Sequence, residues 1–140
     1  MRRLLPSIAI LVLLAVVAAC GEDESTTRQG GDPIAAVAGK WGGTLEQKDT
    51  PPFPIRVTIA SASDRDENVV SYGGTIDCEG TWRYLEQSGD SVVFEEVIGA
   101  GEGGSCKGRG RVTVTPADGD LEYEFRGGGV ASRGRLTPAS

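Results

Sequence analysis

The chain of 140 residues contains no histidine, one methionine, two tryptophans and three cysteines. The absence of histidine excludes Ser-His-Asp and Cys-His catalysis and histidine-ligated zinc, and it removes the usual proton carrier at neutral pH. No other segment matches an enzyme motif. We therefore expect a protein that is not an enzyme and that needs no metal or cofactor.

Basic residues are also few. The chain has 14 Lys and Arg against 20 Asp and Glu, a net charge of −6. Without Arg2 and Arg3 the counts are 12 and 20, which gives −8. This balance argues against binding to nucleic acid and against electrostatic adhesion to anionic lipid, and it favours a solvated, monomeric protein.

The N-terminus has the three parts of an export signal. Met1-Arg2-Arg3 is positively charged, residues 4–17 are apolar except for Pro6 and Ser7, and Val17-Ala18-Ala19-Cys20 follows. This last segment resembles the lipobox of bacterial lipoproteins. The resemblance implies that residues 1–19 are a lipoprotein signal peptide and that Cys20 carries the lipid, whose acyl chains anchor the protein to the membrane.

Two other interpretations of the N-terminus remain open: an ordinary secretory signal or an uncleaved transmembrane helix. About sixteen apolar residues is short for a membrane core of ~30 Å, which needs ~20. The lipoprotein interpretation predicts attachment to the outer face of the cell membrane. A composition rich in Gly, Ala, Val and Arg suggests a Gram-positive, high-GC bacterium, and the outer membrane is the alternative in a Gram-negative one.

Residues 20–37 are expected to be the lipid anchor and a flexible tether. Residues 21–31 hold no large apolar side chain, so burial of apolar surface cannot compensate the conformational entropy that ordering would cost. The root-mean-square reach of such a tether is roughly 20–25 Å. The folded domain is assigned to residues 38–140, and Asp32, Pro33 and Gly39 are placed to cap a short helical turn just before it.

From Trp41 onward, apolar and polar residues alternate in short runs between turn residues, which predicts strands. Two hairpins fix their own register. A turn at Asp118-Gly119 pairs Val114 with Tyr123, and a turn at Gly128-Gly129 pairs Glu124 with Arg133. Around Ser88-Gly89-Asp90 several registers fit equally well. The predicted strands are 41–48, 54–61, 67–73, 78–87, 91–99, 106–115, 120–127 and 130–137.

We therefore predict an all-β fold: a small eight-stranded, antiparallel, up-and-down, lipocalin-like barrel with one disulfide. A β-sandwich is the alternative. An immunoglobulin-type sandwich is disfavoured, because Trp82 follows Cys78 by only four residues. Gly39-Lys40-Trp41 resembles the G-x-W opening of lipocalins, and this resemblance implies a barrel that holds a small ligand.

A wider resemblance covers residues 40–137. The pattern is similar to a small extracytoplasmic β-domain of actinobacterial lipoproteins and of some membrane kinases, a family without an established activity. It implies a location outside the membrane and no mechanism. The matching elements are Trp41 with Gly43, residues 53–57, Cys78-Glu79-Gly80-Thr81, Glu95-Glu96, Cys106, and Leu121, Tyr123 and Phe125.

Cys78 and Cys106 are the two cysteines besides Cys20. In an exported protein such a pair predicts a disulfide, and two free buried thiols are the alternative. The chain-entropy model gives ~3–4 kcal/mol for a loop of this length. We expect a structural role, because no C-x-x-C motif is present.

Two acidic segments were considered as sites. Residues 64–68 begin like a calcium loop, but Val69 replaces the required glycine and Thr75 the required glutamate, so an acidic loop is favoured. Alternation sends Glu95 and Glu96 to opposite faces. Glu96 then faces inward, and a buried carboxylate is costly unless paired, so it belongs to a barrel mouth or to a ligand-binding or hydrogen-bonding network.

The candidate ligand-binding residues are Trp41, Tyr72, Trp82, Tyr84 and Glu96, although core packing is the default role of the aromatics. About twenty large apolar side chains, Val130 among them, are assigned inward. The interior is therefore expected to be mostly filled, with rings over inward glycines 43, 80, 108, 110 and 134. This favours a module that recognises a protein or an envelope polymer. A lipocalin-like barrel for a small hydrophobic ligand is the alternative.

Overall fold

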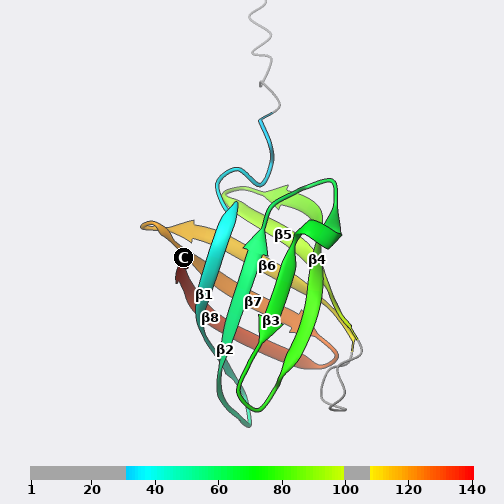
Figure 1. Ribbon diagram of the computed structural model, residues 1–140, viewed down its shortest axis with the longest axis vertical. Coiled ribbons are helices and arrows are strands. Elements are labelled where there is room, and N and C mark those ends of the chain that lie inside the picture. Colours follow the sequence, from blue (N-terminus) through cyan, green and yellow to red (C-terminus); the bar gives the residue numbers. More distant parts are fainter. Residues whose placement is uncertain (1–30, 100–107) are drawn as a thin grey trace, which may run out of the picture.

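The computed structural model describes residues 31–99 and 108–140. They form a closed barrel of eight antiparallel strands, each paired with its neighbours in the sequence, so the predicted fold class is confirmed (Figure 1). The strands are β1 (Gly39–Gln47), β2 (Thr50–Ile59), β3 (Val69–Tyr72), β4 (Cys78–Ser88), β5 (Ser91–Ile98), β6 (Arg109–Ala117), β7 (Asp120–Gly127) and β8 (Val130–Pro138).

Pairing of β1 with β8 closes the barrel. Trp41 lies opposite Pro138, and six further pairs follow down to Gln47 and Ser132. Closure leaves no unpaired strand edge in this sheet, which removes the usual template for aggregation. The sandwich alternative is therefore excluded.

The two hairpins have the predicted registers. Val114 pairs with Tyr123, and Glu124 pairs with Arg133. The register left open around residues 88–90 is also defined, because Ser88 pairs with Ser91 and an irregularity lies between Tyr84 and Glu86. Such an irregularity shifts the alternation of faces along β4, which explains why periodicity alone did not select a register.

One predicted strand is much shorter than expected. Residues 65–67 form a 3-10 turn capped by the Asp64 carboxylate, which accepts a bond from the backbone N–H of Asp66. The Asn68 side chain then turns into the barrel and is fully buried, and β3 begins only at Val69. The calcium-loop interpretation is therefore wrong, because the Asn68 side chain is buried and its oxygen bonds to the backbone.

Asn68 uses all its side-chain hydrogen-bonding capacity to join the β2–β3 connection to β4. Its Oδ1 accepts from the backbone N–H groups of Ala60 (2.7 Å) and Ser61 (2.9 Å). Its Nδ2 donates to the carbonyls of Ser61 (2.6 Å) and Trp82 (3.0 Å). This side chain fixes the connection over the end of the barrel where the chain enters.

The same end is closed by the segment before β1. Asp32 Oδ1 accepts from the N–H of Ile34, and the N–H of Ala38 donates to the carbonyl of Ile34. The N–H groups of Ala35 and Val37 also bond to the carbonyls three residues before them, so residues 32–38 form short consecutive turns. Ile34 and Val37 are fully buried in the core, so this segment packs onto the barrel.

The interior is filled as expected, but aliphatic groups do more of the filling than predicted. A Cβ on Gly110 would lie 1.9 Å from the Phe125 ring, which covers this glycine. Leucine and isoleucine side chains and neighbouring backbone, not rings, lie close to glycines 43, 80 and 134, and nothing lies within 4 Å of a Cβ on Gly108. Val130 is not a core residue, because 39% of it is exposed.

Residues 1–30 and 100–107 lie outside the described part of the chain. The signal peptide, the lipidation site Cys20 and the disulfide partner Cys106 therefore remain predictions. Cys78 itself is buried at the start of β4. No helix in residues 31–99 and 108–140 is long and apolar enough to cross a membrane.

Candidate binding site

Glu96 lies inside the barrel and is the centre of a hydrogen-bonded network. It is only 3% exposed, and its Oε2 accepts a 2.8 Å bond from the indole N–H of Trp82. The same oxygen accepts a short bond from the Tyr72 hydroxyl. The register explains the first contact, since Trp82 and Glu96 are direct partners across β4 and β5. Glu96 is therefore buried and hydrogen-bonded inside the barrel.

The network continues across the barrel to β7 and β8. The hydroxyl oxygens of Tyr72 and Tyr123 lie 3.1 Å apart, and Tyr123 also bonds to Ser132. Tyr123 and Ser132 come from opposite strands of the last hairpin. Side chains of five strands are therefore joined in one hydrogen-bonded chain that runs from Ser132 to the Glu96 carboxylate.

Aromatic rings surround the network. The Trp82 ring stacks on Tyr123 with centroids 6.0 Å apart and contacts Phe94 at 5.4 Å. Phe53 packs edge-on against Tyr72 at 6.0 Å. These rings fill the centre of the barrel and exclude water from the carboxylate on that side.

Burial shifts the ionisation of all three acidic groups. Desolvation raises the pKa of Glu96, and the bonds donated by Tyr72 and Trp82 oppose this rise. Desolvation also raises the pKa of the Tyr72 and Tyr123 hydroxyls. The phenols therefore stay protonated at neutral pH, and the network presents a buried acceptor.

A cavity of about 170 Å³ lies against this network at one mouth of the barrel. The turns after β1, β3 and β7 surround this mouth, at the end opposite to the entering segment 31–38 (Figure 1). Its polar lining residues include Glu96, Ser132 and Arg109, and its apolar lining residues include Phe53, Tyr72, Ile76, Ile98, Tyr123, Phe125 and Val130.

Three of the five predicted ligand-binding residues meet in the network: Tyr72, Trp82 and Glu96. The other two do not. Trp41 lies at the closed end, where its indole donates a 2.8 Å bond to the carbonyl of Val37. Tyr84 is half-buried and packs edge-on against Phe94, 6.3 Å away between centroids. Alternation along a strand defines the face of a residue but not its depth, so it could not separate these two from the rest.

Tyr123 and Ser132 were not among the predicted site residues. The register of the last hairpin nevertheless contained a signal for Ser132, because it places this polar residue on the inward face with Gly134 and Leu136. Tyr123 was predicted to be a core residue. Its hydroxyl links it to the site through Tyr72. An inward hydroxyl on either strand needs a partner, and these two residues provide it for each other.

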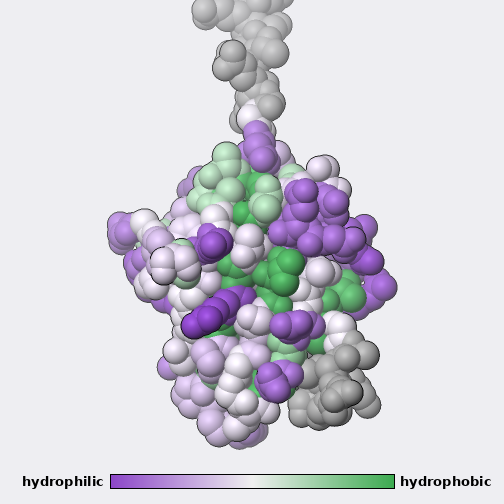
Figure 2. Space-filling model, in the orientation of Figure 1, coloured by the Kyte–Doolittle hydropathy of each residue, from purple (hydrophilic) through white to green (hydrophobic). Residues whose placement is uncertain are grey.

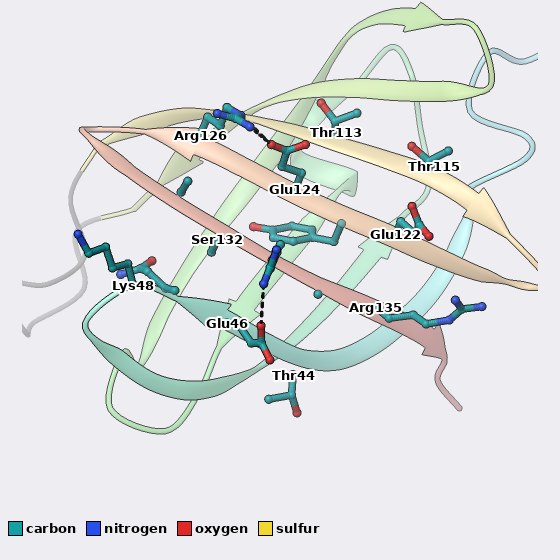
Figure 3. Close-up of a pocket in the computed structure, with 15 residues that line it drawn as sticks. Thr44, Glu46, Lys48, Thr113, Thr115, Glu122, Glu124, Arg126, Ser132 and Arg135 are labelled. Carbon is teal, nitrogen blue, oxygen red and sulfur yellow. Dashed lines mark hydrogen bonds and ion pairs between the residues drawn. The ribbon is translucent and has the colours of Figure 1, made fainter.

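A second feature is a shallow hollow of about 1060 Å³ on the outer surface of β1, β8, β7 and β6, here called the polar groove (Figure 3). Apart from Ala131, its outward-facing side chains are charged or carry hydroxyls: Thr44, Glu46, Lys48, Thr113, Thr115, Glu122, Glu124, Arg126, Arg133 and Arg135.

Ion pairs organise the charges in and beside the polar groove. Arg126 bonds to Glu124 on its own strand, although Arg133 is the direct cross-strand partner of Glu124. Arg133 pairs with Glu46 across β8 and β1 at 3.6 Å, and Arg135 with Asp120 at 2.7 Å. The backbone register of the last hairpin was therefore predicted correctly, but the ion pairs differ from it. Arg126 binds a neighbour on its own strand, Arg135 binds a diagonal neighbour, and Arg133 binds Glu46, its direct partner on β1.

The surface of the described residues has two further hollows, one of about 450 Å³ lined mainly by β1, β2 and β3, and one of about 310 Å³ lined mainly by β2, β3 and the start of β4. The face in Figure 2 is largely hydrophilic with separate apolar patches. Within residues 31–99 and 108–140, no group of three or more Cys, Asp or Glu side chains is placed to hold a metal ion. The candidate sites are the cavity at the mouth, which is lined by the buried Glu96, and the polar groove, whose volume exceeds that of either further hollow.

Comparisons with protein-family models, with curated proteins and with solved structures find no match for this chain.

Proposed function

We propose that this protein is a non-enzymatic binding domain, anchored by lipidated Cys20 to the outer face of the cell membrane. Its partner is a protein at that surface, bound through the polar groove. The anchor follows from the lipobox resemblance of residues 17–20.

The filled interior is the observation that carries this proposal. Twenty apolar residues are buried within residues 31–99 and 108–140, and the cavity at the mouth has only about 170 Å³. Pockets for drug-sized ligands usually need ~300 Å³ or more. The polar groove, at about 1060 Å³, is the larger concave surface and faces outward. Recognition on the outside of the barrel therefore fits the geometry better than carriage inside it.

The charges of the polar groove favour a protein partner. Its lining holds four basic side chains, Lys48 and three arginines, against three acidic ones, Glu46, Glu122 and Glu124. A nearly balanced, mixed-sign surface does not attract a polyanion such as nucleic acid. It suits a partner whose own charges alternate, and arginine is enriched at protein interfaces.

The expected tether limits where that partner lies. A root-mean-square reach of roughly 20–25 Å keeps the domain near the membrane. Burial of Ile34 and Val37 in the domain shortens the available tether further. We therefore favour the extracytoplasmic part of a membrane protein, and an envelope polymer is the second candidate.

Site-specific photocrosslinking in the producing bacterium tests this proposal. A crosslinker at Thr113 in the polar groove should give one discrete adduct in the membrane fraction, and a crosslinker at exposed Gln87 on β4 should not. The double variant Arg133→Glu/Arg135→Glu should abolish the Thr113 adduct. If the domain instead attaches to purified cell-wall polymer, the partner is the polymer and not a protein.

The anchor has its own test. Wild-type protein should partition into the detergent phase and carry diacylglycerol mass on Cys20, and Cys20→Ala should abolish both. A wild-type mature chain that stays aqueous and carries no lipid would refute the anchor. If the wild-type chain carries no lipid but still forms the Thr113 adduct, the anchor is refuted and the proposed binding through the polar groove stands.

A further inference from the structure

The cavity at the mouth brings a buried carboxylate and aromatic rings together. Glu96 lies at its inner end, Phe53, Tyr72, Tyr123 and Phe125 form much of its wall, and Val130 stands at the rim. The mouth faces away from the end where the chain enters from the tether (Figure 1). The mouth therefore opens on the side away from segment 31–38 (Figure 1).

The Glu96 carboxylate still has free acceptor capacity. The bonds from Tyr72 and Trp82 both end on Oε2, and no donor among the described residues reaches Oε1. No fully buried side-chain oxygen or nitrogen of the described residues lacks a partner. The described residues therefore do not bury Oε1 completely. This agrees with the place of Glu96 in the cavity lining.

Glu96 also has no cationic partner in the described part of the chain. Arg109 lines the same cavity, but its guanidinium contacts Glu95 on the outer face at 3.5 Å. A buried carboxylate is costly unless it is paired with a charge. A cation inside the cavity would remove this cost.

The walls define what kind of cation fits. Faces of aromatic rings attract ammonium groups and pack against hydrocarbon at the same time. A dry cavity of ~150 Å³ in another protein holds benzene, so about 170 Å³ accommodates a molecule of roughly six to eight non-hydrogen atoms. A metal ion is disfavoured, because Glu96 is the one carboxylate in this lining.

We propose that the cavity at the mouth binds a small primary ammonium compound, with the ammonium group on Glu96 and its hydrocarbon part against the aromatic wall. This site lies inside the barrel and is separate from the polar groove. It adds a small-molecule ligand to the proposed function and does not depend on it.

Binding is expected to depend on pH through Glu96. The groups facing it are Tyr72 on β3, Trp82 on β4, Tyr123 on β7 and Ser132 on β8, with Arg109 of β6 in the same lining. The phenols do not ionise near neutral pH, and burial raises the pKa of Glu96. Affinity for an ammonium ion should therefore increase with pH until Glu96 is fully ionised.

The test uses the folded domain and n-butylammonium as the probe, followed by ¹H–¹⁵N NMR of the two indole N–H groups. The Trp82 signal should move saturably, because this indole bonds to Glu96. The Trp41 signal should stay in place, because Trp41 lies at the closed end. n-Butanol, the neutral analogue of equal length, should bind at least tenfold more weakly.

Two variants and one control locate the site. Glu96→Gln should weaken n-butylammonium binding at least tenfold, and Glu95→Gln, on the adjacent outward-facing residue, should leave it unchanged. Val130→Trp should fill the mouth and weaken binding without touching Glu96, which covers the case in which Glu96→Gln does not fold. Equal binding of n-butanol, unchanged binding to Val130→Trp, or no shift of the Trp82 signal would overturn the proposal.

Discussion

The indole N–H of Trp82 donates a 2.8 Å hydrogen bond to Glu96, its direct partner across β4 and β5. Both side chains point into the barrel, where Trp82 is fully buried and Glu96 is 3% exposed. The tryptophan thus binds an acidic group that would otherwise be costly to bury. This pair links the packing of the core to the chemistry of the cavity at the mouth.

The first prediction concerns the pH dependence of stability. The pKa of Glu96 is raised in the folded state above its ordinary value of 4.5. Its contribution to stability is therefore fully present below pH 4.5 and is lost as the pH rises through the folded-state pKa. The free energy of unfolding of the wild type, minus that of Glu96→Gln, should decrease over this range.

Urea unfolding of both proteins at several pH values measures this difference. Glu95→Gln is the matched control, because Glu95 lies on the outer face and pairs with Arg83 and Arg109. A difference that stays flat, or that increases with pH, would show that Glu96 is not held in a desolvated site.

The second prediction concerns Gly110. A Cβ there would lie 1.9 Å from the Phe125 ring, so Gly110→Ala forces the ring to move. We expect a loss of about 1–3 kcal/mol in unfolding free energy, the usual cost of overpacking. Gly42→Ala is the control, because its Cβ would meet nothing closer than 3.7 Å.

A Phe125→Ala background distinguishes this mechanism from a backbone effect. Without the ring, Gly110→Ala should cost much less than it does in the wild type. An equal cost in both backgrounds would show that the ring is not the obstacle.

The third prediction concerns Asn68, which is fully buried and makes four side-chain hydrogen bonds. Asn68→Ala leaves the carbonyl of buried Trp82 without its side-chain donor, and it also removes the acceptor of the more exposed Ala60 and Ser61 N–H groups. Each buried polar group left unpaired costs about 1–3 kcal/mol. Thermal unfolding should show a large drop in Tm, whereas Gln87→Ala on the surface should have little effect; similar Tm values for both variants would contradict this role.

The fourth prediction concerns the expected disulfide. A mature domain that begins after Cys20 should contain no free thiol after denaturation, and Cys78→Ser should lower its Tm. The chain-entropy model gives ~3–4 kcal/mol for this loop. Titration of two thiols in freshly isolated protein would refute the pairing with Cys106.

The sequence predicted the barrel well where turns and periodicity agreed. The Asp118-Gly119 and Gly128-Gly129 turns defined their registers, because a slip of one residue would have reversed the faces of both strands. β3 was harder to predict, because it has only four residues and the preceding turn draws Asn68 inward. The β-propensity of the residues alone does not define the bounds and the register of a strand this short.

The site was only partly predictable for a related reason. Periodicity placed Tyr72, Trp82 and Glu96 on the inward face, but it placed Trp41 there as well. Depth along the barrel axis depends on the stagger between all eight strands, which the alternation in any one strand does not contain. Val130 shows the same limit, because it lies at the mouth with 39% of its surface exposed.

The central claim is that the filled barrel recognises a partner on its outside and does not carry a lipid within. Titration of the delipidated domain with a long-chain fatty acid and with a hydrophobic reporter dye, monitored by tryptophan fluorescence, tests it most directly. We predict no saturable binding of either probe, because about 170 Å³ is too small for them. Saturable one-to-one binding in the low micromolar range, with quenching of Trp82, would contradict the claim and establish a carrier of hydrophobic ligands.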